Sequence, residues 1–381
     1  FAFGTGPMVA LGCKFLRICH LNNCATGVAT QNKILREKHY SGLPEKVINY
    51  FEFITQETRE WLAKLAVASL DELIGRTDLL EVIEGTTNKQ KNLNLQVILD
   101  SARRPTQAAP HYQKIINTPF DKGELNRQIL TEVSQQIDEQ SNPSKQPLSL
   151  SYSIKNYDRS VGASLAGYLE KLEKRPQDIS LNFKGIAGQS CGVWNTQGMF
   201  LNLEGDANDY VGKGMSGGCI SIYPQVDIQY VASRGAIIGN TCLYGASGGA
   251  LYAAGQAGER FAVRNSGANA VVEGLGDHGC EYMTGGCVLV LGPVGENFAA
   301  GMTGGFAIVL DLRETLHKKT NFEHVEMLSI TEPECESYHS TLVSLLDEHI
   351  KNTDSPWALK IKNNLFHYLD YFMLIIPKPS G

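Results

Sequence analysis

The sequence has no apolar run long enough to span a bilayer and no stripe of basic residues. A membrane-spanning helix takes about 20 apolar residues, and the longest candidate near the C-terminus, Tyr371–Pro377, is far shorter. The net charge is −6 and the Lys and Arg residues are scattered, which argues against a nucleic-acid or anionic-membrane surface. A signal-peptide pattern is also missing. We therefore expect a cytoplasmic protein without nucleic-acid or membrane partners.

The chain also lacks an initiator methionine and opens on Phe-Ala-Phe-Gly-Thr-Gly-Pro, which is typical of the inside of a fold. We expect a fragment whose upstream portion is missing. Its 381 residues suggest two or three domains, because a single core stops growing at about 250–300 residues. The chain has nine cysteines, an odd number, and we expect them to be reduced thiols that form no stabilising disulfide bonds.

Glycine is abundant, with 38 residues in the whole chain, and the excess lies mainly between positions 185 and 305, where it marks an internal repeat. Four segments share a small hydroxyl residue followed by two glycines: Met215–Gly218, Ala246–Gly249, Met283–Gly286 and Met302–Gly305. Weaker copies occur at Gln197-Gly198 and Ser266-Gly267. Successive markers are 19, 31, 19, 18 and 19 residues apart. A fixed period of this kind is typical of solenoid proteins.

Apolar residues follow each marker at the third and fifth positions, so both members of a pair lie on one face of a strand. The pairs are Leu201/Leu203, Ile220/Ile222, Leu251/Ala253, Ala270/Val272, Val288/Val290 and Ala307/Val309. Stacked copies would build a continuous inner column, and the paired glycines would supply corners with positive φ. The pattern predicts a glycine-rich β-helix. A β-sandwich with glycine-rich turns is the alternative, although a sandwich needs no fixed repeat.

The rest of the chain divides by composition. Residues 1–31 look like ordered loops around a site, and residues 32–100 are helical, with an amphipathic helix that starts at Pro44. Residues 101–148 are rich in Pro, Gln, Asn and Ser and predict a linker with one helix around 124–136. The repeat occupies residues 149–311. The tail, residues 312–381, predicts two helices that cap an end of the solenoid.

Three cysteines lie within twelve residues, in the pattern Cys13-x5-Cys19-x4-Cys24. Structural zinc sites use four ligands, commonly in C-x2–4-C pairs. The intervals here are longer, and the one nearby fourth ligand, His20, adjoins Cys19. Standard four-cysteine clusters also need one more thiolate, whereas a cluster of three irons and four sulfides needs three. The alternative is three buried cysteines without a metal.

These residues carry a resemblance. The run Gly4–Cys13 with its continuations Arg17–Cys24 and Gly27–Gln31 resembles the cluster loop of the glutamate synthase large (alpha) subunit. Further stretches typical of this family are Asn49–Phe51, Ile74–Leu80, Asp158–Ala163, Gly205–Gly214, Arg264–Gly267 and Gly276–Gly286. Many members have Pro-Val after the third cysteine, where this chain has Ala25-Thr26. With Leu21-Asn22-Asn23, that departure is most similar to bacterial NADPH-dependent members.

The resemblance implies the C-terminal part of an enzyme that makes two glutamates from glutamine and 2-oxoglutarate. An upstream amidotransferase domain would release ammonia, and FMN on a (β/α)8 barrel would reduce the imino intermediate. Electrons would come from NADPH through a small (beta) subunit that carries FAD. Residues 1–100 would be the end of the barrel domain with a 3Fe-4S loop, and the β-helix would be architectural.

For the sites, the resemblance implies that Cys13, Cys19 and Cys24 hold the 3Fe-4S cluster, the last relay before FMN. Gly4 and Thr5 are candidates for the edge of the FMN phosphate site, because barrel enzymes bind phosphate at their last strand–helix loops; an ordinary barrel turn is the alternative. No catalytic residue is expected in this fragment, which alone should be inactive. Two other readings stay open, a structural and interaction module and a ferredoxin-dependent relative.

Other reactive residues in the repeat are expected to be structural. Asp277 and His278, with Cys280 and Glu281, should make turn hydrogen bonds. The cysteines that recur with the repeat are expected to be small core residues: Cys191, Cys219, Cys242, Cys280 and Cys287.

Overall fold

The structure is a computed structural model of mixed α/β class with a large, mostly parallel sheet. It describes residues 2–16, 19, 24–30, 32–100, 123–139, 147–172, 177–225 and 231–378. The chain forms two compact units. Unit 1 comprises Phe1–Glu84 and Asn92–Asn117, and unit 2 comprises Gly85–Lys91 and Thr118–Gly381. Among the described helices, none is both long and apolar enough to cross a membrane.

Unit 1 is helical in the part that the structure describes. Its helices are α1 (Thr5–Ala10), α2 (Lys33–His39), α3 (Pro44–Lys64) and α5 (Gln96–Leu99), with 3-10 turns at Asp71–Leu73 and Thr77–Leu79. The predicted helix from Pro44 is confirmed as α3, with Pro44 in the first turn, where proline costs no hydrogen bond. Helix α1 packs on α3, and a side chain at Gly6 would overlap the Tyr50 ring.

Unit 1 has almost no core of its own among the described residues. Only Cys24, Gly27 and Thr30 are buried there, and α3 buries none of its residues. Apolar side chains on α3 are instead exposed, including Phe53 at 74% and Trp61 at 55%. Large apolar side chains exposed along one helix normally pack against other protein.

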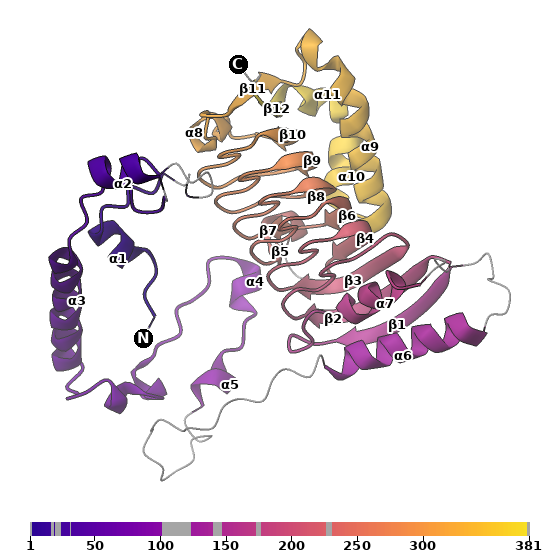
Figure 1. Cartoon of the computed structure of the whole chain (residues 1–381). Coiled ribbons are helices and arrows are strands. Elements are labelled where there is room, and N and C mark those ends of the chain that lie inside the picture. The colour runs from indigo at the N-terminus through magenta and orange to yellow at the C-terminus, as the bar shows by residue number, and fades with distance from the viewer. Residues whose placement is uncertain are drawn as a thin grey trace. The chain divides into compact units, whose positions relative to one another are not determined.

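Unit 2 is built on the parallel sheet (Figure 1). Its strand order is β1-β2-β3-β4-β6-β8-β9-β10-β12-β11, and the pairings from β1 to β10 are all parallel. The strands up to β10 are β1 (Leu148–Ile154), β2 (Ile179–Ala187), β3 (Met199–Ala207), β4 (Ser216–Tyr223), β6 (Gly248–Ala253), β8 (Ser266–Val272), β9 (Thr284–Val290) and β10 (Gly304–Leu310). Two short strands, β5 (Ala236–Ile238) and β7 (Gln256–Ala257), form a second ladder that pairs with β3.

The predicted inner column of apolar pairs is confirmed. Leu201 is in register with Ile220, Ile220 with Leu251, and Leu251 with Ala270, and the column continues to β10. All twelve residues of the six predicted pairs are buried. Because side chains alternate along a strand, one set of residues per copy builds the core and the alternate set faces outward.

The two glycines of each marker have different tasks. At Gly285 a side chain would lie 2.2 Å from the Ser266 carbonyl oxygen, so the first glycine permits close approach to the preceding copy. Gly286 has φ +80°, so the second makes the left-handed corner that the sequence predicts. The backbone after each strand then alternates between right- and left-handed residues, as at Arg260, Ala262 and Arg264. Lateral hydrogen bonds hold this conformation: Arg260 N and Arg264 N donate to the next copy, and Ala262 N donates to the preceding one.

Helices close the β1 end of the sheet. Helix α6 (Glu124–Glu139) packs there with α7 (Ala163–Leu169), and it buries Leu125, Ile129 and Val133. Glu132 on α6 also accepts a hydrogen bond from Tyr152 of β1 at 2.7 Å. The predicted linker over 101–148 therefore contains a helix, close to the expected 124–136, that is part of unit 2. Residues 101–122 and 140–146 lie outside the described residues.

The tail covers a face of the sheet as well as its end. At the end, β12 (Phe372–Pro377) pairs antiparallel with β10, and β11 (Val325–Ser329) pairs with β12. The predicted helices exist as α9 (Glu336–Thr353), α10 (Pro356–Asn363) and the short α11 (Leu365–Tyr368), with α8 (Leu316–Lys319) before them. The prediction that they cap an end was wrong, because α9 and α10 lie along the outer face of the sheet (Figure 1).

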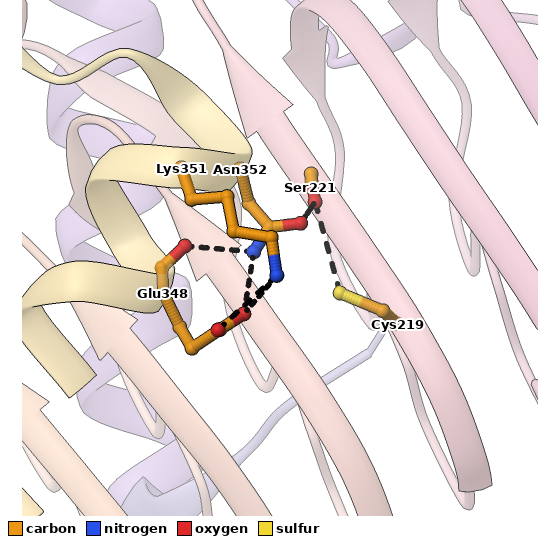
Figure 2. A network of polar contacts seen from close by, with 5 residues as sticks. All are labelled: Cys219, Ser221, Glu348, Lys351 and Asn352. Carbon is orange, nitrogen blue, oxygen red and sulfur yellow. Dashed lines mark hydrogen bonds and ion pairs between the residues drawn. The ribbon is translucent and has the colours of Figure 1, made fainter. Parts of the chain in front are cut away.

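A second apolar core lies between these helices and the outward side chains of β6 to β10. At its margin, polar contacts link α9 to β4, as Figure 2 shows. Ser221 Oγ donates to Asn352 Oδ1 at 3.5 Å, and Asn352 Nδ2 donates to the Glu348 carbonyl at 2.7 Å. Lys351 Nζ lies 3.2 Å from both oxygens of the Glu348 carboxylate. Cys219 Sγ lies 3.7 Å from Ser221 Oγ, so it borders this network.

Candidate functional site

The three predicted ligand cysteines lie in unit 1. Cys13 is partly exposed, Cys19 is exposed and Cys24 is buried, while residues 17–18 and 20–23 lie outside the described residues. Over the described part of the chain, no three His, Cys, Asp or Glu side chains are grouped so as to hold a metal ion. The assignment of a cluster to Cys13, Cys19 and Cys24 therefore stays a prediction, to be judged on the chemistry of each sulfur.

Cys13 directly follows the C-terminal turn of α1. Its N–H donates to the Met8 carbonyl at 3.0 Å, and the Gly12 N–H donates to the Val9 carbonyl at 2.8 Å. With φ +97° at Gly12, this is the Schellman motif that ends many helices. The motif fixes the backbone at Cys13 relative to α1, so the short helix, which the sequence did not predict, orients the first cysteine.

Cys24 is held in an environment that favours its thiolate. The Thr26 hydroxyl lies 3.2 Å from Cys24 Sγ, and the backbone N–H groups of Ala29, Thr26 and Val28 also face the sulfur. Hydrogen bonding from Thr26, with these backbone groups, lowers the pKa of Cys24 to about 7, even though burial opposes the shift. Donors of this kind stabilise the anionic sulfur that binds iron.

A tight turn positions those donors. The Gly27 N–H donates to the Cys24 carbonyl at 2.9 Å, and Gly27 has φ +74°. A side chain at Gly27 would lie 2.8 Å from the Leu35 carbonyl oxygen, so the turn also packs tightly against α2. Asn32 caps that helix, because its Oδ1 accepts from Ile34 N at 3.0 Å and Leu35 N at 3.2 Å.

The cysteines of unit 2 have the opposite chemistry. Burial raises the pKa of Cys191, Cys242 and Cys287 to about 12 and raises that of Cys280 further. These four are buried core residues as predicted. Cys219 is partly buried and packs at the margin of the second core. Sequence alone does not separate the two groups, but the donors around Cys24 do, and its sulfur fits the role of an iron ligand.

Gly4 and Thr5, the candidates for a flavin phosphate edge, lie at the start of α1. Both are exposed, and a side chain at Gly4 would meet nothing within 4 Å. The space beside this backbone is therefore open, and the assignment stays a prediction.

In unit 2, His278 and Glu281 belong to a polar network. His278 Nδ1 lies 2.8 Å from Glu281 Oε1, and Asn297 Nδ2 donates to the same oxygen at 2.9 Å. Asp277 accepts from Glu296 N at 2.7 Å. The bonds from Asn297 and Glu296 link successive turns of the repeat, and the His278–Glu281 contact lies within one turn, as the sequence predicts for turn residues.

Two protein-family models match this chain, one over most of unit 2 and the other over the start of unit 1. The model of the GXGXG motif matches residues 126–378, and the model of the conserved region in glutamate synthase matches residues 1–68. This chain therefore belongs to the GXGXG family. The two matches in this order further define it as a region of the glutamate synthase large subunit.

Relatives with different electron donors are similarly close. The chain is 44% identical over 383 residues to ferredoxin-dependent glutamate synthase of Antithamnion sp., and 42% identical over 386 residues to the large chain of the NADPH glutamate synthase of Azospirillum brasilense. It is 42% identical over 384 residues to the NADH glutamate synthase of Schizosaccharomyces pombe. Each alignment covers 99% of this chain but only 18% to 24% of the relative. These identities therefore do not distinguish the expected NADPH-dependent bacterial type from the ferredoxin- and NADH-dependent types.

Proposed function

We propose that this chain is the C-terminal part of a glutamate synthase, which reductively transfers the glutamine amide nitrogen to 2-oxoglutarate and forms two glutamates. The family membership and the order of the two matched regions support this proposal. The chain spans a quarter or less of the relatives' length. The activity of the whole enzyme therefore depends on residues that this chain does not contain, including most of the flavin barrel.

Within that enzyme, we assign to Cys13, Cys19 and Cys24 the ligation of a 3Fe-4S cluster that relays electrons to FMN. The observation that carries this assignment is the donor set around Cys24 Sγ, which favours the thiolate. A bound cluster supplies one-electron transfer, and its potential depends on hydrogen bonds to sulfur and on burial. Thr26 and the turn at Gly27 would tune it. Gly4 and Thr5 would contact the FMN phosphate.

For unit 2, we propose a β-helix with an architectural role. Three features support it: the parallel, in-register pairing of successive copies, the inner column of apolar residues and the corners at paired glycines. Parallel pairing throughout the repeat also disfavours the sandwich alternative, whose sheets are antiparallel.

The cluster assignment is tested by electron paramagnetic resonance on the anaerobically purified, oxidised, full-length protein. A three-iron signal is expected. The substitution Cys24→Ser should abolish the signal, whereas the control Cys219→Ser, a partly exposed cysteine of unit 2, should leave it intact. Full iron loading without that signal, or a signal that survives Cys24→Ser, would remove the assignment.

The proposed donor is NADPH, delivered by a small beta subunit that carries FAD, because Leu21-Asn22-Asn23 and Ala25-Thr26 resemble bacterial NADPH-dependent members. A ferredoxin-dependent enzyme is the competing form, because ferredoxin-dependent relatives are similarly close to this chain. Assaying the full-length enzyme with NADPH plus the small subunit, and separately with reduced ferredoxin, decides between them. Turnover with ferredoxin alone would reject the NADPH proposal.

A second candidate is that residues 1–381 act as a structural and interaction module. The exposed apolar face of α3 favours it, because such a face needs a packing partner. Residues 1–381 alone should then show no glutamine-dependent oxidation of a reduced donor. Any such turnover would contradict this view.

A further inference from the structure

Two adjoining cavities lie in unit 2 where the carboxyl ends of β6, β8 and β9 face the junction of α9 and α10. Their volumes are about 900 Å³ and 830 Å³, within the range of small-molecule sites. Both are lined by Val231, Ser233, Glu273, Pro356 and Trp357. We call the two together the α9–α10 groove. The network of Figure 2 borders it, since Lys351 and Asn352 line the smaller cavity.

Glu273, on the shared wall of the groove, has only half of its carboxylate bonded. The residue is 1% exposed. Its Oε1 accepts from the Ser355 hydroxyl and lies 3.4 Å from His349 Nε2. Its Oε2 has no hydrogen-bond partner among the described residues, and neither has His349 Nδ1. An unpaired buried carboxylate oxygen is costly and is a strong acceptor for a donor that reaches it. Because Glu273 also lines both cavities, a donor bound in the groove would be the partner that this oxygen lacks.

The rim of the larger cavity is basic. Arg234, Arg313 and Lys360 line it and are exposed, and none of them forms an ion pair within the described ranges. The carboxylate of Asp311 also lines this cavity, where it accepts backbone hydrogen bonds at the start of α8, so three basic side chains face one carboxylate at the rim. Three basic side chains around one opening, on a chain of net charge −6, favour a multiply charged anion.

The wall between these polar groups is apolar. Leu291, Leu310 and Trp357 line it. Trp357 is fixed in place, because its Nε1 donates to the Leu291 carbonyl at 2.7 Å. A small carboxylate or free phosphate would satisfy the rim but would leave this wall and the Glu273 oxygen without contacts. A ligand that uses all three features has an anionic end, a flat apolar body and a hydrogen-bond donor at the far end.

We propose that the α9–α10 groove binds a nucleoside phosphate whose base carries an exocyclic amino group. The phosphate contacts Arg234, Arg313 and Lys360, the base lies on the wall beside Trp357, and the amino group donates to the Glu273 carboxylate. All residues named for this site belong to unit 2, and the proposal does not depend on the redox role proposed above.

Calorimetric titration of residues 1–381 tests the chemistry with three probes. Adenosine monophosphate carries both the phosphate and the amino group, purine riboside monophosphate has a hydrogen in place of the amino group, and adenosine lacks the phosphate. The first should bind at one saturable site, and the other two should bind about tenfold or more weakly, because each loses a charge-assisted hydrogen bond. Absence of binding by adenosine monophosphate at millimolar concentration overturns the proposal, as does equal binding of the two monophosphates.

Substitutions locate the site. Glu273→Gln should remove the preference for adenosine monophosphate over purine riboside monophosphate, and Lys360→Met should weaken the binding of both about equally. The matched controls are Glu281→Gln, a buried glutamate outside the groove, and Lys318→Met, an exposed lysine outside it. If Glu273→Gln does not fold, the wild-type preference and Lys360→Met carry the test. A control that weakens binding as much as its partner overturns the proposal.

Discussion

Thr26 is the residue on which the chemistry of Cys24 most depends. Its hydroxyl lies 3.2 Å from Cys24 Sγ and is the largest cause of the lowered pKa of that thiol. A sulfur with one more donor holds negative charge more readily, which would raise the reduction potential of a cluster bound there.

We predict that Thr26→Val raises the pKa of Cys24 from about 7 toward its ordinary value of 9.0, because the largest cause of the shift is removed. The pH dependence of alkylation at Cys24 in the metal-free protein, followed by peptide mass spectrometry, measures this. Thr55→Val is the control, since the Thr55 hydroxyl donates to the Phe51 carbonyl of α3. An unchanged alkylation midpoint in Thr26→Val would contradict the role given to the hydroxyl.

The same shift predicts a pH-dependent stability. The pKa of Cys24 is lower in the folded than in the unfolded chain, so the ionised thiol stabilises the fold. This contribution is complete above about pH 9 and is lost as the pH falls through about 7. In the metal-free, full-length protein, the midpoint of urea unfolding followed by the exposure of Cys24 should therefore rise between pH 7 and 9, and Thr26→Val should flatten that rise. A rise of the same size in both proteins would reject this origin.

At the scale of the elements, the paired glycines of the repeat give a prediction with an internal control. Gly286→Ala should destabilise unit 2 by about 2–5 kcal/mol, since a left-handed alanine is strained and the added carbon overpacks its site. That carbon would lie 2.3 Å from the Ala268 carbonyl oxygen at φ +80°. Gly167→Ala, in α7 with nothing within 4 Å, should instead stabilise by about 0.5–1 kcal/mol. Urea unfolding followed by circular dichroism measures both, and equal effects would contradict this role of the repeat glycines.

The closing helix α6 gives a second prediction at this scale. Ile129 is 1% exposed and packs into the first core at the β1 end. Ile129→Ala should cost about 2–5 kcal/mol of unfolding free energy, because it leaves a cavity in that core. Gln135→Ala, on the exposed side of the same helix, should change the free energy by less than about 0.5 kcal/mol. A stability unaffected by Ile129→Ala would mean that α6 does not close the core.

The elements also differ in how far the sequence predicted them. The sequence predicted how the strands of successive copies align, because each copy has an inward-facing apolar pair, such as Leu201/Leu203, at a fixed distance from its glycines. The positions of α6 and α9 were not, since an amphipathic helix does not specify which face of a sheet it covers. The Glu273–His349 contact joins residues 76 positions apart, and Thr26 acts through one hydroxyl. Neither has a periodic signal.

At the scale of the whole molecule, the two units differ in what holds them together. Both apolar cores lie in unit 2, including the closing helices at its β1 end and the tail on its outer face. The described residues of unit 1 bury only Cys24, Gly27 and Thr30. Hydrophobic burial is the main favourable term in folding, so independent stability is expected for unit 2 alone.

We therefore predict that residues 118–381 fold as an isolated segment with cooperative thermal unfolding, whereas residues 1–84 do not. The segment 118–381 loses Lys89, whose Nζ lies 2.8 Å from Asp206 Oδ1, but a partly exposed ion pair contributes at most about 1 kcal/mol. Differential scanning calorimetry and amide NMR dispersion of both segments measure the difference. In residues 1–84 the exposed face of α3, with Phe53 and Trp61, should bind an apolar dye and promote association. A cooperative transition in residues 1–84 alone would show that unit 1 holds a core that its buried residues do not account for.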